Sequence, residues 1–308
     1  MNGFAFYPGC ALQSMSWDYR ESLRDVAAAL GLELLELPDW TCCGATAAHS
    51  LDEKMSVVLP TRNLATAQAM GRDLVVACPM CFKRLRTSRH MLEEKRVEDP
   101  WSISPDLEVH DLARLLASEP WLERVADRVS VDLAGLRVVC YYGCQVVRAP
   151  KITGFTDYEN PLHLDRLVSA TGATAIDWSF KATCCGASVG IPRRDIGLAL
   201  VERLLGWARK SGAQAIVVCC PLCQSNLDLL GAELSGRAPD EPVDIRVEVH
   251  VSGRTGRGAV PPAAGAGPRA RLGAVGGESV AWQRSAGRVR RRGDPRRPRR
   301  CDGARVGG

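Results

Sequence analysis

The sequence has few aromatic residues and no long hydrophobic run. Phe, Trp and Tyr make up 6% of its 308 residues, and no apolar stretch approaches the roughly 18 residues that a membrane-spanning helix needs. Residues 1–10 also lack a basic stretch followed by an apolar one, so no secretory signal is visible. These absences predict a cytoplasmic protein without a membrane span.

Acidic residues are scarce in one part of the chain, residues 251–308. This segment has 14 Arg, no Lys and three acidic residues, a net charge of +11, whereas residues 1–250 have a net charge of −6. Arg, Gly, Ala and Pro fill 41 of its 58 positions without an apolar period, so it lacks the apolar surface that offsets the entropy of ordering a chain. We expect a disordered basic tail, or a segment translated out of frame from GC-rich DNA.

An arginine-rich tail is also typical of segments that bind nucleic acid. Apart from Trp282, however, the tail has no aromatic side chain on which a base could stack. Nucleic acid is therefore not an expected partner.

The rest of the chain is an internal repeat. In both copies, 33 residues separate a Cys-Cys-Gly block from a Cys-Pro-x-Cys block, which indicates a duplication. The longer spacing before the second Cys-Cys-Gly predicts an eight-residue insertion within Arg148–Pro161. The paired blocks are Tyr7–Cys10 and Tyr141–Cys144, Thr41–Ala45 and Thr183–Ala187, and Val75–Cys81 and Val217–Cys223.

Each copy alternates short apolar strands with helices. This order predicts an α/β fold with two tandem, pseudo-symmetric domains, each a small parallel sheet with flanking helices. The first domain is expected over residues 1–125 and the second over residues 131–250, with the boundary within Glu119–Leu133. The expected strands include Phe4–Tyr7, Leu32–Leu37, Val138–Tyr142 and Ala173–Trp178, and the expected helices include Val57–Met70 and Ile196–Lys210.

All three cysteine blocks follow predicted strands, and ligands of parallel sheets collect beyond the carboxyl ends of the strands. A glycine after each adjacent cysteine pair permits a positive φ, so that both sulfur atoms can face one side. Cys140, Cys219 and Cys301 have no counterpart in the other copy. The matched sets are Cys10, Cys42, Cys43, Cys78 and Cys81, and Cys144, Cys184, Cys185, Cys220 and Cys223.

Three chemistries suit such cysteines. They can be buried core residues or disulfides, or they can hold a structural zinc ion, which takes four thiolates and leaves the fifth of each set idle. An iron–sulfur cluster takes thiolates, contains more than one metal ion and suits a reducing compartment. Two matching sets of five cysteines in turns favour the cluster.

At these residues the chain resembles the two cysteine-rich CCG domains of the B-type subunits of heterodisulfide reductase. The resemblance also includes Glu159-Asn160-Pro161, Leu164–Leu167 and Asp177-Trp178, and it extends over residues 1–230. It implies that the ten matched cysteines bind the iron of two [4Fe-4S] clusters of non-cubane type. Cys219 is an added thiol beside Cys220. The resemblance also implies an oxidoreductase subunit that interconverts a disulfide and two thiols.

The resemblance implies partners as well. The chain lacks the Cys-x2-Cys-x2-Cys-x3-Cys run of ferredoxins and any Gly-x-Gly-x-x-Gly after a strand. Electrons are therefore expected from two further components of the complex, a ferredoxin-like iron–sulfur protein of the C type and a flavoprotein of the A type. The substrate is expected to be a small-molecule or carrier-bound disulfide.

Two alternatives stay open. The chain can be the electron-transfer iron–sulfur subunit of a glycolate, lactate or glycerol-3-phosphate oxidase, or of a succinate:quinone reductase-type complex, with no disulfide chemistry. It can also be a zinc-stabilised scaffold without a redox role.

Cleavage of a disulfide also needs protons. The nearest titratable candidates for a catalytic role are His49, six residues after Cys43, and Lys181, three residues before Cys184. Alternatively, both are ordinary surface residues. Arg148, Arg193 and Arg194 can hold an anionic substrate or lie on a solvated face.

Overall fold

The structure is a computed structural model that describes residues 3–45, 51–94, 96–237 and 246–247. All of these residues belong to one compact unit. The predicted tail of residues 251–308, the unmatched Cys301 and the candidate proton donor His49 lie outside the described residues.

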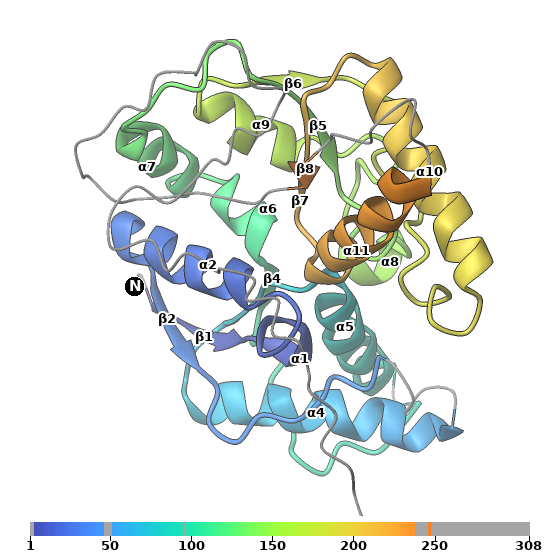
Figure 1. Ribbon diagram of the computed structural model, residues 1–308. Coiled ribbons are helices and arrows are strands. Elements are labelled where there is room, and N and C mark those ends of the chain that lie inside the picture. The colour runs from blue at the N-terminus through green and yellow to red at the C-terminus, as the bar shows by residue number, and fades with distance from the viewer. Residues whose placement is uncertain (1–2, 46–50, 95, 238–245, 248–308) are drawn as a thin grey trace, which may run out of the picture. The chain divides into compact units, whose positions relative to one another are not determined.

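The first half contains a four-stranded parallel sheet with the order β2-β1-β3-β4 (Figure 1). Because parallel neighbours need a crossover, helices connect the strands. The strands are β1 (Gly3–Tyr7), β2 (Glu33–Glu36), β3 (Leu74–Val76) and β4 (Val109–Asp111). The helices are α1 (Gly9–Leu12), α2 (Trp17–Leu30), α4 (Glu53–Ala69), α5 (Pro79–Glu93) and α6 (Leu112–Leu116).

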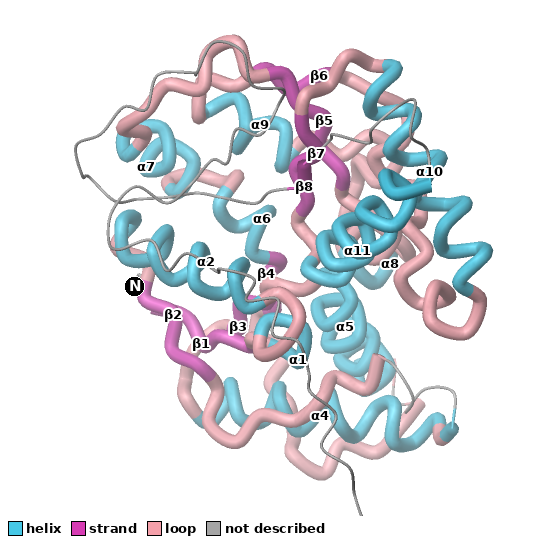
Figure 2. Tube along the Cα trace, viewed as in Figure 1, coloured by secondary structure: helices cyan, strands magenta, loops and turns pink. Residues whose placement is uncertain are grey.

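The second half repeats this plan with the sheet order β6-β5-β7-β8, again parallel throughout (Figure 2). The predicted α/β class with two similar halves is therefore confirmed. The strands are β5 (Arg137–Tyr141), β6 (Thr174–Ile176), β7 (Ala215–Val218) and β8 (Arg246–Val247). The helices are α8 (Pro150–Thr153), α9 (His163–Ala170), α10 (Arg194–Lys210) and α11 (Pro221–Arg237).

Local sequence signals explain where the helices near the cysteines begin. Asp52 caps α4, because its carboxylate accepts hydrogen bonds from the amides of Lys54 (2.7 Å) and Met55 (3.2 Å). Pro79 and Pro221 are the first residues of α5 and α11, where a missing N–H costs nothing. Each Cys-Pro-x-Cys block thus lies at a strand-to-helix junction.

The predicted boundary segment contains a helix, α7 (Trp121–Arg128). Trp121 and Val125 are buried, and they share a core cluster with Leu23 and Val26 of α2. The four-residue spacing places both side chains on one helix face. Leu167 and Ala170 of α9 pack against the same cluster, so this segment packs against both α2 and α9 rather than forming an open linker.

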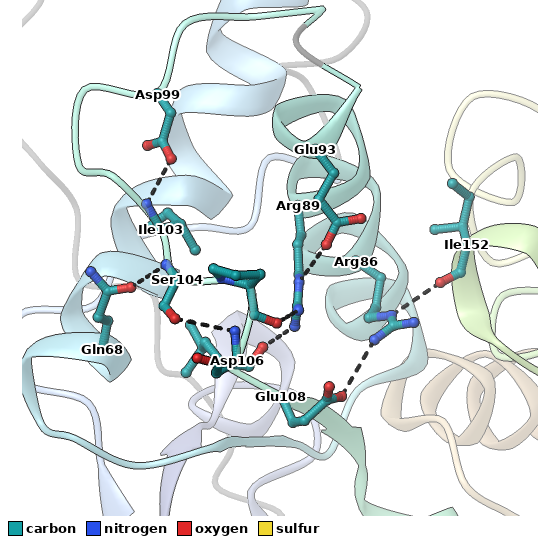
Figure 3. Close-up of polar contacts among 12 residues, drawn as sticks. Gln68, Arg86, Arg89, Glu93, Asp99, Ile103, Ser104, Asp106, Glu108 and Ile152 are labelled. Atoms are coloured by element: carbon teal, nitrogen blue, oxygen red, sulfur yellow. Dashed lines mark hydrogen bonds and ion pairs between the residues drawn. The ribbon is translucent and has the colours of Figure 1, made fainter.

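The two halves are joined by contacts of the predicted insertion. Arg86 on α5 donates to the carbonyl of Ile152 in α8 (3.0 Å) and lies 3.8 Å from Glu108 (Figure 3). Arg114 donates to the carbonyl of Gly154 (3.0 Å), and its guanidinium carbon lies 4.5 Å from the ring centroid of Phe155. One core cluster contains residues of both halves, including Tyr7 and Val76 with Val138 and Tyr142.

Candidate metal centre

The cysteines of each half meet at the carboxyl edge of its sheet. In the first half, β1 pairs with both β2 and β3, so the direction of the strand order changes between β1 and β3. Ligands of open parallel sheets bind at such a switch point. Cys10 follows β1, Cys42 and Cys43 follow β2, and Cys78 and Cys81 follow β3.

The five cysteines of the first half form a chain of thiol contacts. The sulfur atoms of Cys43 and Cys81 lie 3.3 Å apart. Side-chain interactions that shift their pKa values also link Cys10 to Cys42, Cys42 to Cys43, and Cys81 to Cys78. The structure therefore brings the whole first set together.

The second half has the same arrangement. The sulfur atoms of Cys185 and Cys223 lie 3.5 Å apart. Side-chain interactions that shift their pKa values link Cys144 to Cys184 and Cys223 to Cys220, and Cys144 interacts electrostatically with Cys185. The second set is therefore also gathered at one sheet edge.

The two sets touch each other. The side chains of Cys78 and Cys220 interact across the halves, and each thiol shifts the pKa of the other. Both residues are buried and precede the first residue of a helix, α5 or α11. Ten thiols thus form one array across the halves.

Equivalent glycines make room for the sulfur atoms. Gly9 and Gly143 both have a φ of +69°, and a Cβ at either position would lie 3.0 Å from the sulfur of Cys81 or Cys223. A side chain there would strain the backbone and press on a thiol. The predicted positive φ after the cysteine pairs is confirmed at Gly44 (+75°) and Gly186 (+84°).

Interactions within the sets favour the thiolate form of the first cysteine of each pair. Contacts from Cys10 and Cys43 lower the pKa of Cys42 to about 2. A contact from Cys144 lowers the pKa of Cys184 to about 6 despite partial burial. The thiolate is the form that binds metal ions. Each set therefore contains a cysteine that favours the metal-binding form.

The unmatched thiols Cys140 and Cys219 lie apart from the second set. Cys219 is buried in the core cluster shared by the two halves, with its sulfur 3.7 Å from the carbonyl oxygen of Tyr142. Cys220 belongs to the other cluster, with Cys185 and Cys223. Burial raises the pKa of both unmatched thiols.

Lys181 is a buried residue, which contradicts the surface alternative for it. It is 2% exposed, and its ammonium group lies 3.0 Å from Asp165 and 3.5 Å from Asp177. Its carbonyl accepts hydrogen bonds from the amides of Tyr142 and Gly143, directly before Cys144. Lys181 therefore ties the loop of the second cysteine pair to the Cys144 turn.

The three candidate arginines differ in their surroundings. Arg148 is exposed, and its charge helps to lower the pKa of Cys184. Arg193 forms a 2.7 Å ion pair with Asp195, and Arg194 pairs with Glu233. Only Arg148 of these three has an electrostatic contact with a cysteine of the matched sets among the described residues.

Sequence reasoning missed several residues that position the cysteine loops. The hydroxyls of Tyr7 and Tyr141 donate to the carbonyls of Thr41 (2.7 Å) and Thr183 (2.5 Å), the residues directly before each pair. Asn63 binds both the amide and the carbonyl of Thr41. Equivalent positions in the two copies are the signal that reveals the tyrosines.

Asn226 and Arg84 occupy equivalent helix positions beside the two sets. Asn226 donates to the carbonyl of Cys185 (2.8 Å). Arg84 interacts electrostatically with Cys43, although burial lowers its pKa. The two helices therefore place an amide near one pair and a cation near the other.

The donor sets consist of thiols, the ligands of iron–sulfur clusters. Among the residues that the structure describes, no three His, Cys, Asp or Glu side chains form a ready group around one metal ion. Instead, the sulfur atoms approach in pairs. Iron–sulfur clusters are held by cysteine thiolates, the donors that both sets supply.

Comparisons with known proteins agree with this donor chemistry. The model of the CCG family, "Cysteine-rich domain", matches residues 4–86 and 138–228. The chain is 30% identical over 234 residues to the 8-methylmenaquinol:fumarate reductase membrane anchor subunit of Wolinella succinogenes, with 73% of this chain and 82% of that one covered. In the described part of this chain, no helix is long and apolar enough to cross a bilayer.

Two further relatives have names that mention related redox complexes. The chain is 26% identical over 241 residues to the B-type subunit of the ferredoxin:CoB-CoM heterodisulfide reductase of Methanosarcina mazei, covering 74% of this chain and 80% of that one. It is 24% identical over 239 residues to the probable glycolate oxidase iron-sulfur subunit of Bacillus subtilis, covering 76% of this chain and 51% of that one.

Proposed function

Because the chain belongs to the CCG family of cysteine-rich domains, we propose that it is the iron–sulfur subunit of a heterodisulfide reductase-type oxidoreductase complex. The observation that carries this proposal is the pair of equivalent five-cysteine sets, each gathered at the carboxyl edge of its sheet. The proposed reaction interconverts a disulfide and two thiols.

Ten cysteines are the proposed ligands of two [4Fe-4S] clusters, which the family resemblance predicts to be non-cubane. When bound, such clusters supply or accept single electrons. The lowered pKa values of Cys42 and Cys184 support ligation, because these side chains are thiolates near neutral pH. The proposed ligands are Cys10, Cys42, Cys43, Cys78, Cys81, Cys144, Cys184, Cys185, Cys220 and Cys223.

The contact between Cys78 and Cys220 joins the two cysteine sets. It supports a single substrate that interacts with both sets. Reduction of a disulfide to two thiols consumes two electrons and two protons. His49 and Lys181 are the proposed proton donors, and the ammonium group of Lys181 contacts two carboxylates. Arg148, exposed beside Cys184, is the proposed contact for an anionic substrate.

The proposed complex supplies the electrons. Its other members are a flavoprotein and a ferredoxin-like iron–sulfur protein, because the chain has neither a ferredoxin-type cysteine run nor a dinucleotide-binding glycine motif. The proposed location is the cytoplasm, where thiols stay reduced.

A second candidate is an electron-relay subunit without disulfide chemistry. The similarity to the fumarate reductase membrane anchor subunit of Wolinella succinogenes favours it, as does the similarity to the probable glycolate oxidase subunit of Bacillus subtilis. In this case the same ten cysteines hold the clusters, and the substrate is oxidised or reduced elsewhere in the complex.

Anaerobic purification followed by thiol titration distinguishes the two candidates. The full chain is oxidised stepwise in the presence of a small thiol, and paramagnetic species are recorded by EPR. Disulfide chemistry predicts a signal that appears only with thiol and broadens when the thiol carries 33S. Viologen-dependent reduction of a panel of alkyl disulfides, including lipoamide, provides the activity assay.

An EPR signal of the cluster that is the same with and without thiol, together with no disulfide reduction, would support the electron-relay candidate. A colourless protein with stoichiometric zinc would exclude both candidates and favour the scaffold.

A further inference from the structure

Four aromatic rings run in sequence from the second cysteine set to the protein surface. The ring centroids of Tyr141 and Trp178 lie 6.2 Å apart, those of Trp178 and Phe180 lie 5.9 Å apart, and those of Phe180 and Trp207 lie 5.0 Å apart. The last pair is stacked, with an interplanar angle of 20°. We call these four residues the aromatic ladder.

The inner end of the ladder touches the cysteines. Tyr141 is 1% exposed and shares a buried core cluster with Cys185 and Cys223, and its hydroxyl donates to the carbonyl of Thr183, two residues before Cys185. The nearby thiols of Cys223 and Cys185 contribute to raising the pKa of Tyr141, after burial. The phenol is therefore neutral and lies beside the second cysteine set.

The outer end of the ladder reaches solvent. Trp178 is 8% exposed and donates its indole N–H to the carbonyl of Cys140 (2.8 Å), whereas Trp207 on α10 is 42% exposed. The ammonium of Lys210 lies 4.7 Å from the ring centroid of Trp207. A soluble molecule can thus reach Trp207 but not Trp178.

The first half has only the beginning of such a path. Tyr7 and Trp40 are in edge contact at 5.5 Å, and no further ring contact continues from Trp40 in the described part of the chain. Trp40 directly precedes Thr41, whereas Ser179–Ala182 separate Trp178 from Thr183. This four-residue difference supplies Phe180, the ring that joins Trp178 to Trp207.

We propose that the aromatic ladder carries single oxidising equivalents from the second cysteine set to Trp207. Tyr and Trp lose one electron more readily than other side chains apart from the sulfur-containing ones. The ring contacts keep each transfer short, and Phe180 serves as a bridge between two oxidisable rings. The proposal goes beyond the proposed function, because it concerns the repair of an oxidised cysteine and not the interconversion of a disulfide and two thiols.

The transfer conserves electrons and protons. A one-electron oxidant removes an electron from the Cys185 thiolate and leaves a thiyl radical. One electron then passes along the ladder from Trp207, which restores the thiolate, and the indole proton of Trp207 goes to water. A soluble thiol donates a hydrogen atom to the Trp207 radical and becomes a thiyl radical itself. Cys185 thus avoids the irreversible sulfinic and sulfonic acids.

The test compares Trp207→Phe with Trp17→Phe in the anaerobically purified full chain. Phenylalanine keeps a ring against Phe180 but is not readily oxidised. Trp17 is 64% exposed and has no ring contact among the described residues, so it is the matched control. Each protein receives hexachloroiridate, a one-electron oxidant, with glutathione present, and is then exposed to air, whose oxygen adds to any thiyl radical that has not been repaired and carries it toward the sulfinic and sulfonic acids. Mass spectrometry then measures sulfinic and sulfonic acid at every cysteine.

We expect Trp207→Phe to increase oxidation at Cys185 and Cys223 several-fold, with Cys43 and Cys81 unchanged as internal references. Trp17→Phe is expected to match the parent. Equal damage in the two variants, or an equal rise in both cysteine sets, would overturn the proposal.

A second measurement does not depend on damage. Rapid freezing after oxidation, followed by EPR, should detect an indolyl radical in the parent that is lost in Trp207→Phe and reduced in Phe180→Leu. An unchanged radical in Trp207→Phe would contradict the route even if both variants fold normally.

Discussion

The two halves of the molecule share a cysteine frame and differ in what surrounds it. Both place a tyrosine hydroxyl on the carbonyl before the cysteine pair and a positive-φ glycine before the single cysteine. Within the described ranges, the second half adds α8, the buried Lys181 and the complete aromatic ladder. The shared features position sulfur atoms, and the additions alter their environment.

The largest expected effect comes from two single variants, each of which removes one thiol from one half. Cys81→Ser and Cys223→Ser should each abolish the iron of one half and leave the other half loaded, because each serine removes a thiolate from only one set. Iron and sulfide analysis with EPR of each variant measures this.

Cys219→Ser is the matched control, since Cys219 is buried beside Cys220 but contacts Tyr142. It should retain the iron of both halves. Loss of all iron in Cys81→Ser would show that the halves do not load independently.

The next effect concerns the buried ion pair of the second half. Lys181→Met leaves Asp165 without its cation at a site where Lys181 is 2% exposed. Breaking such a pair costs about 3–5 kcal/mol, and chemical denaturation of the metal-free chain measures it.

Arg72→Met is the comparison in the first half, because Arg72 pairs with Glu33 at the surface with 32% exposure. An exposed pair contributes about 0–1 kcal/mol. If the two variants lose equal stability, the Lys181 pair does not distinguish the halves.

Replacing the glycine before Cys10 or the glycine before Cys144 with alanine should have the same effect on its own half. Gly9→Ala and Gly143→Ala impose a left-handed backbone on alanine, at about 1–2 kcal/mol. They also bring a Cβ to 3.0 Å from the sulfur of Cys81 or Cys223. Each variant should lose stability and lower the iron content of its own half.

Gly71→Ala separates strain from crowding. Gly71 has a φ of +63°, and a Cβ there would meet nothing within 4 Å. It should lose comparable stability while keeping the iron of both halves. Reduced iron in this variant would assign the effect to general destabilisation.

The smallest effect concerns the charge beside Cys184. The pKa of Cys184 is lowered to about 6, first by the contact from Cys144 and in part by Arg148. Arg148→Gln should raise this pKa, so less thiolate is present between pH 6 and 7 and alkylation there becomes slower. Iodoacetamide labelling of the metal-free chain across pH measures it.

Arg193→Gln is the control, because Arg193 is paired with Asp195. Its labelling profile at Cys184 should match that of the parent. Identical profiles for both variants would show that the charge of Arg148 does not affect the pKa of Cys184.

The repeat made the fold and the cysteine sets predictable from sequence. Equal spacing of the Cys-Cys-Gly and Cys-Pro-x-Cys blocks identified both sets, and the glycine after each pair indicated its backbone conformation. These features are local, so the sequence contains them directly.

Tertiary contacts were not predictable in the same way. The burial of Lys181 depends on Asp165, which is distant in sequence, and the link between Cys78 and Cys220 depends on how the halves pack. The boundary helix α7 was missed because Trp121 and Val125 form too short an apolar pattern to stand out.

The most direct test is the metal content of the anaerobically purified full chain. If both five-cysteine sets bind iron–sulfur clusters, iron and acid-labile sulfide will be present in near-equal amounts, and Cys81→Ser and Cys223→Ser will each remove a separate share. Stoichiometric zinc without sulfide, or iron that survives loss of either thiol, would contradict this assignment.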